Sequence, residues 1–183
     1  MENVEFFIIN GQTCISRNGV SSPLSEKDRD VIHFMIQQLH MYFPDALQQL
    51  QVWAAESMSN RWYYEYRIVD RFIRCNFGEA DFMHPDLDDL GMFHFEEVKC
   101  PLRSICKMEG TVCKPKVKTV LSEEEERVAK LYAKGYVPGE IAEKLGKSVN
   151  TCKTLLMKAC KKLKLPNRRW LIRLFSIYNV TNF

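Results

Sequence analysis

Four cysteines in the middle of the chain are the residues with the clearest potential to bind a metal. Of the seven cysteines in the 183-residue chain, four fall within 39 residues: Cys75, Cys100, Cys106 and Cys113. Thiolates that converge from loops and from the ends of helices bind zinc or an iron–sulfur cluster. The alternative is that these four are free cysteines that pack as small apolar side chains. We expect that second role for the remaining three, which are Cys14, Cys152 and Cys160.

The gaps between these cysteines bear on which metal they would hold. Structural zinc sites usually contain paired cysteines two to four residues apart, because four sulfurs must crowd around one small ion. Here five residues separate Cys100 from Cys106, six separate Cys106 from Cys113, and no Cys-x-x-Cys occurs. A [4Fe–4S] cluster spreads its thiolates over a larger cube, which suits longer gaps and the Cys100-Pro101 dipeptide. Zinc would act as a structural staple, whereas a cluster would sense redox state, oxygen or iron. Both alternatives stay open.

A second set of residues has the composition of a magnesium site. Pro85-Asp86 followed by Glu97-Val98-Lys99 matches the loose pattern of a metal-dependent nuclease. In such an enzyme two carboxylates bind Mg²⁺ and the lysine orients an attacking water. The pattern is very common by chance, and this part of the chain has no room for the α/β core that the enzyme needs. A solvated acidic turn is therefore the favoured interpretation. Because no other residues form a typical catalytic set, the sequence indicates a protein that is not an enzyme.

The elements best defined by local signals lie in residues 121–173. Ser122 is followed by Glu123, Glu124 and Glu125, which is typical of a capped helix start with carboxylates at the positive end of the helix dipole. Pro138 is suited to open a second helix, Gly146 to end it, and Ser148 to cap a third. Two short helices joined by a Gly-containing turn are the geometry that places the second helix in a DNA groove.

The string EIAEKLGKSVNTCKTLLMKACKKL, which begins at Glu140 and is followed by Asn167-Arg168, resembles the LuxR/FixJ-type helix-turn-helix of bacterial transcription regulators. The resemblance is ungapped and covers residues 121–173, under a third of the chain. The family usually has Val where Cys152 stands and His where Leu155 stands. Sigma-factor DNA-binding regions share part of the string, so a sigma-factor-like promoter-binding subunit is the alternative. The Asn-Arg start of the last helix favours the LuxR type.

The recognition helix implied by this resemblance spans residues 148–163 and has one apolar and one basic face. Its apolar positions are three and four residues apart, as a buried stripe requires: Val149, Cys152, Leu156, Ala159 and Leu163. The opposite face is rich in lysine, which would place ammonium groups near phosphates. The resemblance implies that three side chains reach base edges in double-stranded DNA: Lys153, Thr154 and Met157. Phosphate contacts are expected from five others: Ser148, Thr151, Lys158, Lys161 and Arg168.

Charge is distributed unevenly along the chain. Residues 114–183 contain 12 Lys and 4 Arg against 6 Glu, a net charge of +10, although the whole chain carries only +3. Residues 1–113 must therefore carry −7. Such a division is typical of a basic nucleic-acid-binding module joined to an acidic domain with a different purpose.

These observations predict a mainly α-helical protein with two domains. Residues 1–113 would form an acidic, mostly helical regulatory domain with a short hairpin or strand and a Cys-rich loop, and residues 114–120 a basic linker. Residues 121–183 would form a four-helix, LuxR-type helix-turn-helix domain. The elements expected in the first domain are a hairpin of 4–9 and 13–16, helices over 25–43, 45–58 and 61–75, and a strand over 93–98. Ser25 would cap the first of these helices.

The combined prediction is a cytoplasmic bacterial transcription regulator that binds double-stranded DNA. The start of the chain, MENVEFFIINGQ, has no basic leader, and its apolar run is too short for export or for spanning a membrane. Cysteines without a secretion signal indicate a reducing compartment. The last helix, expected over 167–178, would pack partly on its own domain and partly against a second copy, giving a homodimer. RNA polymerase is a further expected partner.

Overall fold

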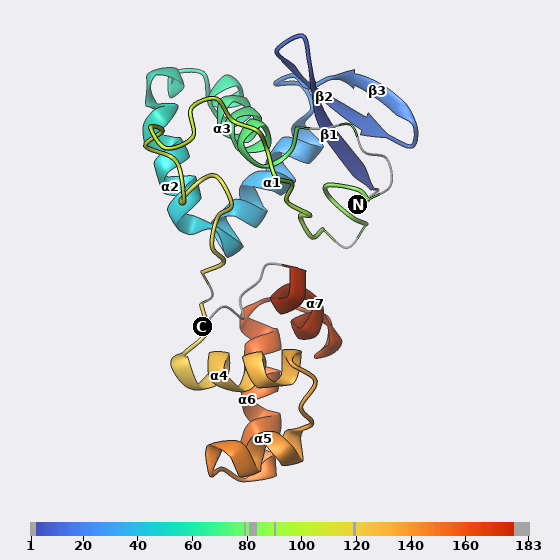
Figure 1. Cartoon of the computed structure of the whole chain (residues 1–183), viewed down its shortest axis with the longest axis vertical. Helices are drawn as coiled ribbons and strands as arrows, with labels where there is room; N and C mark the ends of the chain where they lie inside the picture. Colours follow the sequence, from blue (N-terminus) through green and yellow to red (C-terminus); the bar gives the residue numbers. More distant parts are fainter. Residues whose placement is uncertain (1–2, 79, 81–83, 90, 119, 178–183) are drawn as a thin grey trace. The chain divides into compact units, whose positions relative to one another are not determined.

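A computed structural model describes residues 3–78, 80, 84–89, 91–118 and 120–177 of the chain (Figure 1). The chain divides into two compact units, Met1–Lys116 and Val117–Phe183. Within the described residues, the first unit contains a small sheet and three α-helices, and the second contains four α-helices. The expectation of a mainly helical protein is confirmed.

The sheet of the first unit is an antiparallel meander in the order β1-β2-β3. Its strands are β1 (Val4–Ile9), β2 (Gln12–Arg17) and β3 (Val20–Pro23). Each connection is an Asn-Gly pair with both residues at positive φ, Asn10-Gly11 at 50° and 75° and Asn18-Gly19 at 50° and 77°. Two-residue hairpin turns of this kind match the twist of the flanking strands. The predicted first hairpin is confirmed. The second was missed, although Asn18-Gly19 carries the same signal.

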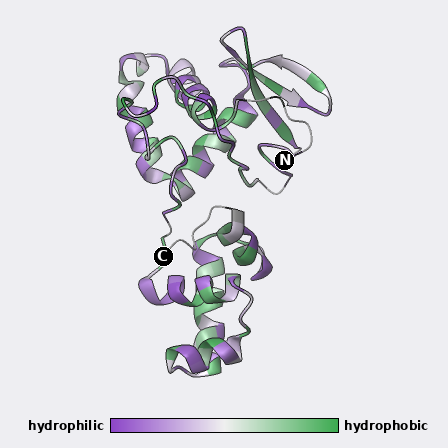
Figure 2. Cartoon of the chain, viewed as in Figure 1, coloured by the Kyte–Doolittle hydropathy of each residue, from purple (hydrophilic) through white to green (hydrophobic). Residues whose placement is uncertain are grey.

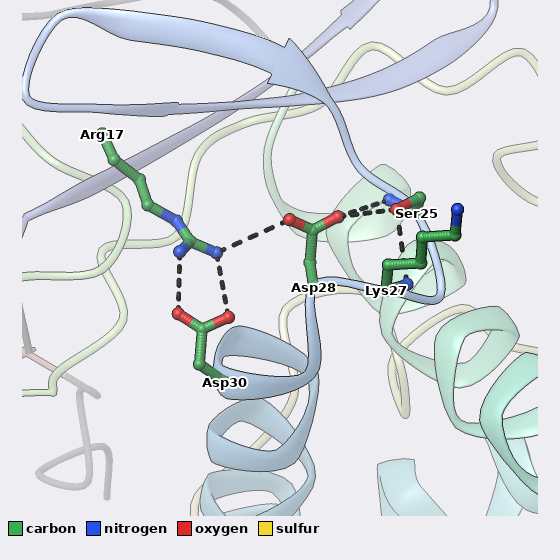
Figure 3. A network of polar contacts seen from close by, with 5 residues as sticks. All are labelled: Arg17, Ser25, Lys27, Asp28 and Asp30. Carbon is green, nitrogen blue, oxygen red and sulfur yellow. Dashed lines mark hydrogen bonds and ion pairs between the residues drawn. The ribbon is translucent and has the colours of Figure 1, made fainter.

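Helix α1 (Arg29–Tyr42) begins later than the sequence predicted. The expected cap by Ser25 is wrong. The carboxylate of Asp28 instead accepts a hydrogen bond from the Ser25 backbone N–H at 2.8 Å and another from the Ser25 hydroxyl at 2.9 Å (Figure 3). These bonds fold the segment into a turn, and helical geometry begins only after it. Arg17 of β2 pairs with Asp30 at 2.7 Å, which joins the sheet to the start of the helix.

The following helices complete the first unit. The helix expected over 45–58 is shorter than predicted, because α2 (Pro44–Trp53) gives way to a 3₁₀ turn, η1 (Ala55–Ser57). Helix α3 (Arg61–Asn76) lies almost where the sequence placed it. Asn60 caps this helix by accepting a hydrogen bond from the Tyr63 N–H at 3.2 Å.

Residues 93–98 do not form the predicted strand. Phe93 makes an isolated bridge to Leu87, and the segment otherwise has no regular structure. Phe93 and Phe95 instead enter an aromatic cluster, with ring centroids 5.5–6.2 Å from those of Phe43, Phe72 and Phe77. Alternating apolar residues therefore produced a strand-like pattern in a segment whose phenylalanines pack into an aromatic cluster and that pairs with Leu87 only through an isolated bridge.

The second unit is built from α4 (Glu123–Ala133), α5 (Pro138–Leu145), α6 (Val149–Lys162) and α7 (Arg169–Ile177). Figure 2 shows hydrophobic and hydrophilic residues alternating along these helices, as amphipathic helices require. Fully buried side chains from all four helices make the core: Val128, Ala129, Ile141, Cys152, Leu156, Ala159, Leu171, Leu174 and Phe175. Among the described residues, no helix is both long and apolar enough to cross a membrane.

Candidate DNA-binding surface and cysteine cluster

The turn between α5 and α6 is held by local capping interactions. Gly146 ends α5 at φ 62° and ψ 37°, a left-handed conformation that suits glycine. Ser148 caps α6, because its Oγ accepts a hydrogen bond from the Thr151 N–H at 3.0 Å. The hydroxyls of Ser148 and Thr151 also lie 2.8 Å apart. Since only one of them donates in that contact, the other keeps a proton for an external acceptor. The caps expected at Gly146 and Ser148 are confirmed.

One face of α6 is buried in the second unit. Cys152, Leu156 and Ala159 are fully buried, and Leu163 follows them at the helix end with 1% exposure. Val149 was predicted to belong to this stripe, but 42% of it is exposed. The prediction is wrong because Val149 is the first residue after the cap, and the core begins only one turn further along.

The opposite face of α6 is exposed and basic. Its exposed residues are Asn150, Thr151, Lys153, Thr154, Met157, Lys158 and Lys161. Among the described residues, Lys153, Lys158 and Lys161 have no hydrogen-bond or ion-pair partner. We call this strip of seven residues the basic face. Arg168, expected to contact phosphate, is half-buried, and its charge acts on the Cys160 thiol.

Two ion pairs link α4 to α6 and to the turn that precedes α6. Lys162 Nζ lies 2.6 Å from Glu125 Oε2, and Lys147 Nζ lies 2.6 Å from Glu124 Oε2. Glu125 also accepts from the Ser122 N–H at 2.9 Å, which completes a capping box at the start of α4. Burial opposes ionisation of Glu125, but the hydrogen bonds from Lys162 and Ser122 outweigh it and lower the pKa of this carboxyl.

The four cysteines predicted to bind metal converge in the first unit. Cys75 lies in the last turn of α3, and the other three lie in the segment that follows Val98. Together with Arg103 and Glu109, all four line one small pocket that is partly open to solvent: Cys75, Cys100, Cys106 and Cys113. Each is partly buried. The remaining cysteines, Cys14, Cys152 and Cys160, are buried elsewhere.

Hydrogen bonds fold the cysteine segment onto α3. The side-chain amide of Asn76, which is 1% exposed, donates to Val112 O at 2.9 Å and accepts from the Lys114 N–H at 2.9 Å. These two bonds flank Cys113 and place it beside Cys75, the residue that precedes Asn76 in the chain. Successive turns then carry the backbone past Cys106, whose N–H donates to Leu102 O at 3.0 Å.

The thiols influence one another electrostatically. Burial raises the pKa of Cys75 to about 12, and the neighbouring Cys113 and Cys106 add to the effect, while the Arg71 guanidinium opposes it. Burial likewise raises the pKa of Cys113, with further contributions from Cys106 and Cys100. All four sulfurs are therefore close enough for the charge of one thiolate to be felt by the others. Arg71, four residues before Cys75 on α3, was not singled out from the sequence.

The carboxylates of the nuclease pattern are not brought together. Asp86 is 2% exposed and accepts from the Phe6 N–H at 2.7 Å. Its oxygens lie within 4.8 Å of those of Glu5 and Glu96, not of Glu97. The Glu97 side chain is 80% exposed and pairs with Lys114 at 3.0 Å. The nuclease alternative is therefore not supported, because Asp86 faces the core and Glu97 the solvent. The favoured interpretation of a solvated acidic turn is wrong as well, because Asp86 and Asp88 are only 2% and 4% exposed.

Comparison with known proteins places one part of the chain in a family. Residues 119–175 match the family model described as bacterial regulatory proteins, luxR family. No curated protein and no solved structure was found to match the chain. The matched residues include all of α4, α5 and α6 and most of α7, with the capped turn and the basic face among them. Residues 119–175 therefore match a helix-turn-helix domain of the luxR family, which supports DNA binding and transcription regulation as the role of this part of the chain.

Proposed function

We propose that the protein is a sequence-specific regulator that lays α6 in the major groove of double-stranded DNA. The observation that carries this proposal is the basic face, where Lys153, Lys158 and Lys161 have no partner among the described residues. A major groove admits one α-helix, and unpaired ammonium groups along that helix displace counterions from the phosphates. The net charge of +10 in residues 114–183 supports the same partner.

Within the basic face, three residues are suited to read bases. Lys153 and Thr154 lie one turn from the capped start of α6, the part of a recognition helix that enters the groove most deeply. Lys153 Nζ would donate to guanine O6 or N7. Met157 is 56% exposed, and the Met157 side chain and the Thr154 methyl would contact a thymine methyl.

The remaining polar groups are suited to bind phosphate. Lys158 and Lys161 lie further along α6, and the free hydroxyl proton of the Ser148–Thr151 pair lies at the helix start, where the dipole favours an anion. Arg168 would join them at the start of α7, with part of its side chain covered. Such contacts would orient the domain on the duplex without reading its sequence.

Two substitutions separate these roles. Duplex sites are first selected from random DNA by the wild-type protein, and affinity is then measured against salt concentration for selected and scrambled sites. Lys161→Ala should weaken both and reduce the slope of log affinity against log salt by about one. Lys153→Ala should remove about 1–3 kcal/mol of discrimination at one base pair. Lys130→Gln is the control, because Lys130 lies on α4 and pairs with Glu126 at 2.8 Å.

The outcomes are distinguishable. Equal losses on all sequences for Lys153→Ala would remove the base-reading assignment and leave the phosphate role. If neither Lys153→Ala nor Lys161→Ala differs from Lys130→Gln, the DNA-binding surface lies elsewhere than on α6.

We also propose that the regulator binds as a homodimer through α7. Leu171, Leu174 and Phe175 are fully buried in the core of their own unit. The surface left for a second copy is smaller than the sequence suggested and centres on Ile172, 38% exposed, and the half-buried Trp170. Tyr178, expected to contribute, lies outside the described residues. Sedimentation at micromolar concentration should show a dimer that Ile172→Asp converts to a monomer. A wild-type monomer, with and without DNA, would contradict the proposal.

Finally, we infer that the first unit regulates the second through a metal site formed by the four cysteines. The feature that supports this role is their convergence on one cavity from α3 and from the segment that leads to the second unit. A metal bound there would link the end of that segment to α3. Binding or loss of the metal would therefore change the conformation of the last residues of the first unit.

A further inference from the structure

We propose that Cys75, Cys100, Cys106 and Cys113 bind a [4Fe–4S] cluster, and not a single zinc ion. This inference deepens the metal site proposed above and rests on it. Three observations carry it: the separation of the sulfurs as a set, the hydrogen bonds that hold the backbone around them, and a buried donor beside them.

Cys75 and Cys113 lie within hydrogen-bonding reach of each other, but the four sulfurs as a set are not grouped as compactly as a zinc tetrahedron requires. In a zinc site each Zn–S bond is about 2.3 Å, which places every pair of sulfurs about 3.8 Å apart. In this protein the four thiols line the same cavity, yet no three of these described sulfurs lie within 4.8 Å of one another. A [4Fe–4S] cluster binds each thiolate to a different iron at the corners of a cube, so its ligands stand farther apart. The set of four sulfurs is therefore spread more widely than a single zinc ion requires.

The scaffold explains why the sulfurs do not simply collapse together. Asn76 holds the residues on both sides of Cys113 through its bonds to Val112 and Lys114. Ser104, in the left-handed conformation at φ 72°, donates from its backbone N–H to Glu109 Oε2 at 2.5 Å, a bond that spans Cys106. Hydrogen bonds from the side chains of Asn76 and Glu109 therefore hold the backbone that carries Cys106 and Cys113.

The positive charges of two arginines would partly offset the negative charge of a bound cluster. When four thiols release their protons to solvent and bind a [4Fe–4S]²⁺ core, the assembly carries a net charge of −2. Arg103 lines the cavity, and the Arg71 charge acts on both Cys75 and Cys113. The Nε–H of Arg71 is buried and donates to no described residue. A cluster sulfur is an acceptor that would satisfy it, and hydrogen bonds of this kind set cluster potentials.

Metal analysis of the full-length protein tests the proposal directly. The chain is purified without oxygen, and iron, acid-labile sulfide, zinc and visible absorption are measured on the same sample. The expected result is about four irons and four sulfides per chain with a brown colour. Cys100→Ser and Cys106→Ser should each lose most of the iron, and Cys14→Ser, which alters a buried cysteine outside the cavity, should retain it.

Each other outcome overturns the assignment in a different way. One zinc per chain without sulfide would refute the cluster and leave the proposed metal site standing. A protein without metal, which also fails to take up iron and sulfide on reconstitution, would refute both. The wild-type protein alone distinguishes these results, so the test does not depend on whether a variant folds. DNA binding is measured in a separate assay.

Discussion

Replacing Glu125 by Gln should destabilise the DNA-binding domain through the ion pair that joins α4 to α6. The substitution keeps the shape of the side chain and an oxygen that accepts from the Ser122 N–H, so the capping box survives. What it removes is the negative charge 2.6 Å from Lys162 Nζ. The effect therefore isolates the interhelical pair from the helix cap.

The size of the effect lies between two limits. Breaking a fully buried ion pair costs about 3–5 kcal/mol, and exposed pairs contribute about 0.2–1 kcal/mol. Here the Glu125 side chain is 5% exposed and that of Lys162 is 44% exposed, so solvent screens one end of the pair. We expect a loss of about 1–2 kcal/mol, which raises the unfolding equilibrium constant about 5- to 30-fold.

The same pair makes a prediction about pH. The pKa of Glu125 is lowered in the folded state, so its contribution is fully present above the ordinary carboxyl value of 4.5 and is lost as pH falls through the lowered folded value. The difference between wild type and Glu125→Gln should therefore be constant near neutral pH and shrink below about pH 4.5.

Denaturant unfolding at equilibrium checks both statements. Trp170 is the only tryptophan of residues 117–183, so its fluorescence reports on this unit when Trp53 and Trp62 are replaced by Phe. Glu126→Gln is the matched control, since Glu126 lies next in the same helix turn and pairs with Lys130 near the surface. The reasoning is refuted if Glu125→Gln and Glu126→Gln lose the same stability, or if a double-mutant cycle with Lys162→Gln shows no coupling.

Three further changes test other parts of the structure. Leu156→Ala should cost about 2–5 kcal/mol of unfolding free energy because the side chain is fully buried, whereas Val149→Ala should cost under about 0.5 kcal/mol; equal losses would contradict the assigned faces of α6. Asn76→Ala should destabilise the first unit by about 1–3 kcal/mol and lower its iron content, measured by denaturation and metal analysis, while unchanged iron would remove its positioning role. Arg71→Gln should keep the iron and shift the cluster's reduction potential to more negative values, and an unchanged potential in redox titration would place the guanidinium away from the cluster.

Local chemistry made much of the second unit predictable. The caps at Ser122 and Ser148 and the left-handed end at Gly146 all depend on atoms within four residues of each other. Short stretches of sequence determine such interactions, and these interactions in turn determine where the helices of this unit begin and end. At Ser25 the same reasoning failed. The Asp28 carboxylate accepts a hydrogen bond from the Ser25 backbone N–H, and this bond stabilises a turn where the sequence predicted the start of a helix.

Periodicity identified which residues are apolar, but it did not say what they would touch. The alternating pattern of 93–98 arises from phenylalanines that pack against Phe43, which lies between α1 and α2, and against Phe72 and Phe77 in and directly after α3. Among the described residues, Phe93 pairs with another segment only through an isolated bridge to Leu87. Val149 fits the stripe of α6 by spacing, yet it lies before the point where the helix meets the core. Burial depends on the neighbouring elements, which a periodic pattern does not specify.

By itself the sequence determined that a basic, luxR-type helix-turn-helix follows an acidic half with four closely spaced cysteines. Only the tertiary structure decided that those cysteines share one cavity, how far apart their sulfurs lie, and that Asn76 and Arg71 stand beside them. It also placed Asp86 beside Glu5, 81 residues earlier in the chain, and away from Glu97. The physical reason is that these contacts join residues far apart in the sequence and so close long loops. Which of these contacts form depends on the packing of the whole unit more than on local conformational preferences.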